Sequence, residues 1–154
     1  MQLEEILTVE RVVTPLDVSS KQDALAGMAQ LFVSAPGAPR PDEVLQVLSE
    51  RERLASTGVG SGVAIPHGRV PRLEKLIAAV GVSPGGIPFD AIDGQPVHIL
   101  VAVLAPQRHT GDHLKVLAQV SRLLRSDQMR QRLVEAPDAA QVLSLLFEAD
   151  RRGA

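Results

Sequence analysis

Among the four histidines of the chain, His67 stands in the most constrained setting. The segment GVGSGVAIPHGRV, residues 58–70, places it between Pro66 and Gly68 after a glycine-rich loop. Proline fixes its own φ and restricts the preceding residue, whereas glycine allows another backbone to approach closely. Backbone N–H groups of residues 57–62 can turn inward to bind an anion. The pattern predicts a neutral imidazole beside a backbone anion site, an arrangement suited to a phosphoryl group.

His113 is the second candidate, because it opens a predicted helix directly after the most strongly predicted strand, residues 97–104. In α/β sheets, functional sites collect at the carboxyl ends of strands. A helix N-terminus disfavours a protonated imidazole and favours an anion, so His113 can stay neutral and donate an N–H to a phosphoryl group. The ordinary alternative for both histidines is a structural or solvated side chain. His98 and His109 are weaker candidates.

Motif spacing and composition argue against several other chemistries. The chain contains no cysteine, which excludes disulfides, thiol nucleophiles and cysteine-based metal sites. It has no H-E-x-x-H motif, and we expect neither a metal nor another cofactor. The glycine loop is spaced G-x-G-x-G, precedes a strand and lacks a following lysine, so it is neither a Walker A loop nor a dinucleotide fingerprint. It also lacks the G-x-S-x-G pattern of serine hydrolases.

The bulk composition favours one globular domain spanning residues 1–154. The chain is 45% hydrophobic, enough to bury one sizeable core. Sixteen basic and eighteen acidic residues give a net charge of -2, so nothing indicates nucleic acid or an anionic membrane. The N-terminus is acidic where a signal peptide is basic, and no apolar run approaches the roughly 20 residues that span a bilayer. We therefore expect a cytoplasmic protein that is not embedded in a membrane.

The elements that position the histidines follow from two hydrophobic periods, in the order helix, helix, strands, helices. A helix capped by Ser19 or Ser20 is predicted to end near residue 35, and a second begins at Pro41. The second helix is predicted to bury Val44, Leu45, Leu48 and Leu54. Strands are predicted at 63–66, 76–82, 89–92 and 97–104, with a turn at 83–88. Further helices are predicted to begin at 110–112, 126–127 and 138.

The strand at 97–104 decides the fold class. Its run VHILVAVL is apolar, rich in β-branched residues and bounded by proline on both sides. A strand that is apolar on both faces needs cover on both faces. The sequence therefore predicts an α/β sandwich, with a mixed sheet between helical layers.

Four segments resemble one known family. The run RERLASTGVGSGVAIPHGRV (51–70) resembles the phosphorylation-site signature of fructose/mannitol-type EIIA domains of the bacterial phosphotransferase system. The runs QLEEIL (2–7), FDAIDGQPVHILVAVLAPQ (89–107) and HLKVLAQVSRLL (113–124) resemble its nitrogen-regulatory branch, EIIA-Ntr. The resemblance covers nearly the whole chain. It implies a three-layer sandwich, with a mixed, mostly parallel sheet covered by helices on both faces.

The resemblance also implies roles for individual residues. His67 would accept a phosphoryl group from the carrier protein HPr or its nitrogen paralogue, as a tele-phosphohistidine intermediate. His113 would support the transfer without carrying the group, and no cofactor is implied. The other phosphoryl-binding positions implied by the resemblance are Arg51, Ser56, Thr57 and Gly68.

The function expected from this resemblance is that of a phosphotransferase component, a phosphocarrier of the nitrogen-related system that regulates partners through its phosphorylation state. Potassium transport proteins and sensor kinases are the family's expected targets. One alternative is a sugar-specific EIIA that passes the phosphoryl group to an EIIB permease component. A second is a binding module in which His67 is never phosphorylated. A third, nucleotide binding on the glycine loop, is disfavoured because the Walker lysine is missing.

Overall fold

Strand β6 (Val97–Pro106) is the axis of the fold in this computed structural model, which describes residues 1–108 and 110–153. Side chains along a strand alternate between the two faces of a sheet. Ile99, Val101 and Val103 accordingly enter one hydrophobic core, whereas Leu100 and Leu104 enter the other. The strand is buried along almost its whole length, which confirms the prediction that it needs cover on both faces.

The sheet is mixed, as predicted. The strands other than β6 are β1 (Val12–Val13), β2 (Gly58–Gly60), β3 (Val63–Ala64), β4 (His67–Val70) and β5 (Ile77–Ile87). Their order is β1-β5-β6-β3-β2, and β4 also pairs with β6. Among the described strands, β1–β5, β3–β6 and β4–β6 are parallel pairs, and β2–β3 and β5–β6 are antiparallel.

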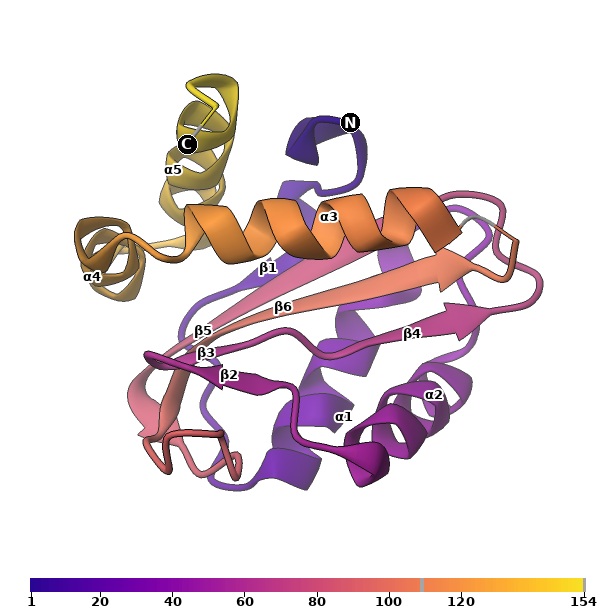
Figure 1. Ribbon diagram of the computed structural model, residues 1–154, viewed down its shortest axis with the longest axis horizontal. Helices are drawn as coiled ribbons and strands as arrows, with labels where there is room; N and C mark the ends of the chain where they lie inside the picture. Colours follow the sequence, from indigo (N-terminus) through magenta and orange to yellow (C-terminus); the bar gives the residue numbers. More distant parts are fainter. Residues whose placement is uncertain (109, 154) are drawn as a thin grey trace.

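Helices cover both faces of this sheet, as Figure 1 shows. One layer consists of α1 (Lys21–Leu31) and α2 (Pro41–Leu54). The other consists of α3 (Thr110–Leu123), α4 (Asp127–Glu135) and α5 (Ala139–Arg151). Short 3-10 turns are Leu3–Glu5, Val9–Arg11 and Phe32–Ser34. Two hydrophobic cores result, one between the sheet and each helical layer. No described helix is long and apolar enough to cross a membrane.

The helix starts follow the capping residues of the sequence. The Ser20 hydroxyl accepts a hydrogen bond from the Asp23 N–H at 3.1 Å, and Ser126 accepts one from Met129 at 3.1 Å. The Asp138 carboxylate caps α5 in the same way. Pro41 occupies the first turn of α2, where its missing N–H has no cost. These predicted helix starts are therefore confirmed.

Two predictions around β5 are wrong. The turn predicted at 83–88 is part of the strand, which continues to Ile87 with a shift of register after Val82. Proline and glycine are tolerated there because a bulge does not need every ladder hydrogen bond. The strand predicted at 89–92 does not form. Asp90 has φ 54°, a left-handed conformation that no strand accommodates, and Ala91 begins a tight turn closed by the Gly94 N–H.

The prediction that Leu54 is buried is also wrong. Its side chain is 81% exposed, and Glu52 is the residue of that turn that is buried. Residues four apart lie on one face of a helix, so the stripe that begins with Val44 and Leu48 continues to Glu52. A carboxylate therefore occupies a core position of α2, two residues before the helix ends.

Candidate functional site

His67 opens β4 at the point where the sheet passes from β3 to β4. Both strands pair with β6 in one continuous register, from Ala64 opposite Leu100 to His67 opposite Val103. The Pro66 carbonyl keeps the ladder intact by accepting the Val103 N–H at 2.9 Å. Proline has no N–H of its own to donate. His67 is thus fixed by backbone pairing immediately after a break between two strands.

One hydrogen bond determines which nitrogen of His67 can react. Nδ1 lies 2.6 Å from the Ile65 carbonyl oxygen. A carbonyl can only accept, so Nδ1 carries the proton and donates. Nε2 then keeps its lone pair. The side chain is only partly buried. The result is an oriented, neutral imidazole with a nucleophilic Nε2.

His113 lies against His67, so the two histidines that the sequence indicated as candidates are neighbours in the fold. The ring centroids are 5.5 Å apart and the ring planes meet at 73°, an edge-to-face contact. His113 belongs to the first turn of α3 and is only 5% exposed. Its Nε2 is buried without a hydrogen-bond partner among the residues that the structure describes. Buried polar atoms normally have a partner, so this nitrogen is suited to an incoming polar group.

Both imidazoles are held neutral by their surroundings. Burial lowers the pKa of His67, the Ile65 hydrogen bond opposes this, and the nearby Arg51 charge lowers the pKa further. Burial also lowers the pKa of His113, with contributions from His67 and from the Arg69 guanidinium. A neutral imidazole keeps the lone pair that a nucleophile needs.

These shifts predict a loss of stability in mild acid. A histidine with a lowered pKa contributes stability above its ordinary value near 6.5, which is lost as the pH falls through the folded-state pKa. We expect the free energy of unfolding, measured with urea, to fall between about pH 7 and pH 5. The double variant His67→Gln/His113→Gln is expected to show a shallower fall. An equal fall in the variant would assign the acid sensitivity to other groups.

Arg51 and Ser56 lie at the end of α2 and just beyond it. Arg51 is half-buried, donates from Nη1 to the Ala55 carbonyl at 3.0 Å, and its charge reaches His67. The Ser56 hydroxyl donates to the Phe89 carbonyl at 3.1 Å and accepts the Gly58 N–H at 3.0 Å. A hydroxyl has one proton, so that of Ser56 is already engaged within the loop.

Thr57 is engaged in the same way, by the carboxylate of Glu52, which was not among the site residues expected from the sequence. Its hydroxyl donates to Glu52 Oε1 at 2.5 Å and its N–H to Glu52 Oε2 at 2.9 Å. Lys21 lies 2.8 Å from Glu52 Oε2. The signal that could have revealed Glu52 is its core position on α2, since a buried carboxylate needs partners. Arg69 is a further missed residue, revealed only by its charge acting on His113.

The glycine loop offers fewer N–H groups to an anion than we expected. Besides the N–H groups of Thr57 and Gly58, that of Ser61 is also used, donating to the Asp93 carboxylate at 2.9 Å. Ser61 has φ 57°, between two glycines with positive φ. The loop is thus folded around carboxylate and hydroxyl groups of its own chain, and these three N–H groups are not available to an anion.

Gly68 is required by packing. A Cβ at this position would overlap Val47 Cγ1 on α2, and Val47 is stiff because it is β-branched in a helix. We expect Gly68→Ala to lower the free energy of unfolding by about 1–3 kcal/mol in urea melts. Gly85→Ala, where no atom lies within 4 Å, is the matched strand control. Adding Val47→Ala should restore most of the loss, and a purely additive double variant would contradict this explanation.

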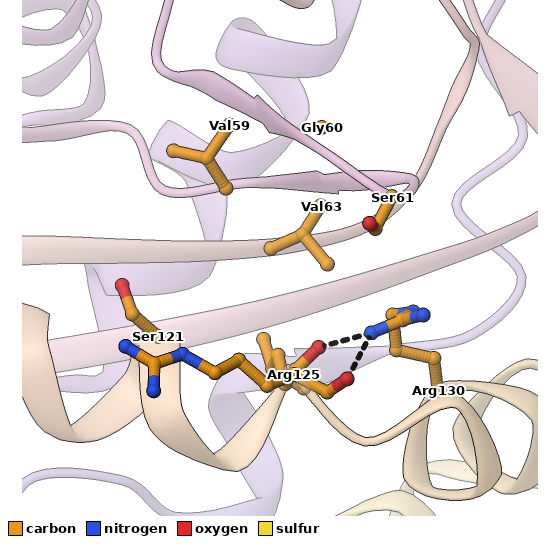
Figure 2. Close-up of a pocket in the computed structure, with 8 residues that line it drawn as sticks. Val59, Gly60, Ser61, Val63, Ser121, Arg125 and Arg130 are labelled. Carbon is orange, nitrogen blue, oxygen red and sulfur yellow. Dashed lines mark hydrogen bonds between the residues drawn. The ribbon is translucent and has the colours of Figure 1, made fainter. Parts of the chain in front are cut away.

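A separate pocket of about 260 Å³ lies between the β2–β3 hairpin and the C-terminal end of α3 (Figure 2). Val59 and Ser61 line it from the hairpin and Arg125 from the helix. Arg130 donates to the carbonyls of Leu124 and Arg125 at 2.6 and 2.8 Å, which completes the end of α3. Neither His67 nor His113 lines this pocket, so the histidine pair occupies a different part of the surface.

His98 is not part of the pair. His98 donates from Nδ1 to the Ser83 carbonyl at 3.0 Å, because a carbonyl oxygen can only accept. His109 lies outside the described residues. Within residues 1–108 and 110–153, no three metal-ligating side chains are grouped to hold an ion.

Comparisons with known proteins extend along nearly the whole chain. The family model described as "Phosphoenolpyruvate-dependent sugar phosphotransferase system, EIIA 2" matches residues 5–149, a range that contains both histidines of the pair. A "Nitrogen regulatory protein" of Bradyrhizobium diazoefficiens is 38% identical over 146 residues, covering 95% of each chain. A "PTS system fructose-specific EIIA component" of Haloferax volcanii is 36% identical over 143 residues, covering 88% of this chain and 93% of that protein.

A solved structure agrees with these matches. The crystal structure of the nitrogen regulatory protein IIA-Ntr from Neisseria meningitidis matches with a TM-score of 0.86 and 32% identity. The match covers 92% of this chain and 97% of that one. The predicted fold class, a mixed sheet between helical layers, is therefore confirmed by topology and by likeness to a solved structure.

Proposed function

We propose, from the premise that the chain belongs to the EIIA 2 family of the phosphoenolpyruvate-dependent sugar phosphotransferase system, that His67 accepts a phosphoryl group from an HPr-like carrier protein. One observation carries this proposal. The Ile65 carbonyl holds the Nδ1 proton of His67, which leaves a lone pair on Nε2 of a ring that contacts His113, whose buried Nε2 has no hydrogen-bond partner among the described residues.

The transfer is an in-line displacement between two imidazoles. The Nε2 lone pair of His67 attacks phosphorus, the Nε2–P bond forms, and the N–P bond of the donor phosphohistidine breaks. The electron pair of the broken bond returns to the donor nitrogen, so no proton has to move. The tele-phosphohistidine that results retains its Nδ1 proton and a positive ring charge, which the Ile65 carbonyl stabilises. The protein's contribution is therefore positioning and charge stabilisation.

His113 and Arg51 are the groups that we propose to stabilise the transferring oxygens. An N–H of the neutral His113 imidazole can donate to one of them, and the positive end of α3 favours the negative charge. Arg51 supplies a fixed positive charge close enough to act on His67. We propose that Ser56, Thr57 and Gly68 contribute indirectly, because the two hydroxyl protons are engaged and Gly68 packs on α2.

The surface around the pair suits a protein donor. Leu114, which directly follows His113 in α3, is 65% exposed, whereas Val63 and Ile65 are core residues. Val59 is 55% exposed but lines the separate pocket at the end of α3. Exposed apolar side chains beside a polar site are typical of protein contacts. A carrier protein can therefore dock its own phosphohistidine over His67.

We further propose that the phosphorylation state regulates partner proteins, since a phosphoryl group adds charge to a docking face. This rests on the similarity to nitrogen regulatory proteins. The expected targets of that branch are potassium transport proteins and sensor kinases. The sugar-specific alternative is onward transfer of the phosphoryl group to an EIIB component. Its support is the 36% identity to the fructose-specific relative. Transfer from the phosphorylated protein to a fructose-type EIIB separates the two.

The proposal is tested by incubating the protein with a phosphorylated HPr-type donor and measuring its intact mass. We expect one acid-labile phosphoryl group, and none when ATP and Mg²⁺ replace the donor. A protein that stays unmodified, while the same donor phosphorylates another EIIA 2 protein, would overturn the proposal. The binding-module alternative would then become the leading hypothesis.

A further inference from the structure

A buried carboxylate is connected to the Nδ1 hydrogen bond of His67 through the backbone. Glu52 is 8% exposed and binds the Thr57 N–H and hydroxyl at 2.9 and 2.5 Å. The Thr57 carbonyl accepts the Ile65 N–H at 3.0 Å. The Ile65 carbonyl in turn accepts the Nδ1 proton of His67 at 2.6 Å. Thr57 takes part in both the first and the second of these hydrogen-bonded steps, and Ile65 takes part in both the second and the third.

Lys21 anchors the carboxylate from a different helix. Its Nζ lies 2.8 Å from Glu52 Oε2, at the first residue of α1. The Glu52 side chain is 5% exposed and that of Lys21 is 23% exposed, so water screens this pair little. Lys21 also lies 5.0 Å above the Phe89 ring, and the Phe89 carbonyl accepts the Ser56 hydroxyl. The loop before His67 is therefore held from both Glu52 and Phe89.

The donor set explains why an acidic residue occupies a core position. Three donors converge on the two oxygens of Glu52, namely Lys21 Nζ and the Thr57 N–H and hydroxyl. An ionised carboxylate only accepts, and it can accept all three. A buried acceptor satisfied in this way makes a rigid network. Ordinary packing does not require such a group two residues before the end of α2.

We propose that Glu52 is a positioning residue for His67, which acts through Thr57 and Ile65 to fix the carbonyl that holds the Nδ1 proton. The inference rests on the proposed function, because it assigns Glu52 to the orientation of the phosphoryl acceptor. Without Glu52, residue 57 loses two hydrogen bonds and the Ile65 carbonyl is no longer fixed. The proton of the His67 ring then distributes between Nδ1 and Nε2, and a ring protonated on Nε2 has no lone pair on that atom with which to form the Nε2–P bond.

The test compares Glu52→Ala with Glu52→Gln in the complete, unphosphorylated protein. Ring ¹⁵N NMR spectra at a pH where His67 is neutral report the tautomer directly. We expect the wild type and Glu52→Gln to keep the proton on Nδ1, because the glutamine amide can still accept from the Thr57 N–H and donate to its hydroxyl oxygen. We expect Glu52→Ala to show a mixture of tautomers. A pure Nδ1–H signal in folded Glu52→Ala would overturn the proposal.

Kinetics with a phosphorylated HPr-type donor provide the second readout. We expect Glu52→Ala to lower the maximal transfer rate by about 10- to 100-fold with little change in the donor KM, since Glu52 is buried and does not touch the donor. Glu52→Gln should retain most of the rate. Equal losses in both variants would show that the charge of Glu52, and not its geometry, matters, and this would also overturn the proposal.

A milder variant pair covers the case in which Glu52→Ala does not fold. Thr57→Val removes only the hydroxyl hydrogen bond to Glu52, and Thr57→Ser keeps it. We expect a partial shift of tautomer in Thr57→Val and none in Thr57→Ser, and a wild-type tautomer in both would count against the proposal. The tautomer measurement needs no phosphoryl donor. If the wild type is not phosphorylated, the proposed function fails, while the positioning of the ring by Glu52 is still decided by NMR.

Discussion

The His67→Gln protein is expected to gain no phosphoryl group from a phosphorylated HPr-type donor, under conditions in which the wild type gains one. Glutamine approximates the size of histidine, but the lone pair of its amide nitrogen is delocalised into the carbonyl group, so no N–P bond can form. The loss should be complete, because Nε2 of His113, the other histidine of the pair, is buried. Intact-mass measurement over a time course decides the outcome.

Two controls make this result specific. His98→Gln replaces a histidine outside the pair and should accept the phosphoryl group at the wild-type rate. Circular dichroism of His67→Gln should match the wild type, since this side chain is only partly buried. Acid-labile phosphorylation of His67→Gln, at the wild-type stoichiometry, would contradict the assignment of the acceptor.

His113→Ala is expected to retain the stoichiometry of one phosphoryl group but to accept it about 100-fold more slowly. The magnitude is that of removing one preorganised donor from a charge-stabilising site. The edge-to-face contact with His67 places the imidazole close enough for this role. Rapid-quench sampling of the transfer, at saturating donor, measures the rate constant without interference from docking.

The matched variant for this prediction is His113→Gln. The glutamine side chain keeps an N–H donor at a similar reach, so it should recover part of the lost rate. Urea unfolding of both variants separates lost stability from lost transfer, since His113 is buried. If both variants accept the group as fast as the wild type, His113 has only a packing role.

The sequence alone was sufficient for features that depend on neighbours along the chain. The caps at Ser20, Ser126 and Asp138 were read correctly because a cap binds an N–H only a few residues away. Strand β6 was recognised because its apolar run needs no knowledge of its partners. His67 was singled out as a candidate for the same reason, since Pro66 and Gly68 constrain it locally. The family resemblance, now confirmed, added the function expected of it.

Local patterns failed where the partner group lies far along the chain. The N–H groups of the glycine loop were expected to bind an anion, yet Ser61 donates to Asp93, which belongs to another loop. The turn predicted at 83–88 is a strand because β6 pairs beside it. Glu52 was passed over because a carboxylate on an amphipathic helix is usually solvated. Its burial is possible because Lys21 of α1 and two donors of Thr57 bind its oxygens.

The sequence by itself determined the layered fold, the two candidate histidines and the local constraint on His67. Only the tertiary structure decided that the two rings touch, that Ile65 holds the Nδ1 proton, and that a buried carboxylate is connected to this bond through Thr57 and Ile65. The physical reason is that β6 pairs with β4 and leads into α3, so the sheet brings His67 and His113 together. Hydrophobic period specifies which faces are buried, whereas strand pairing specifies which distant side chains meet.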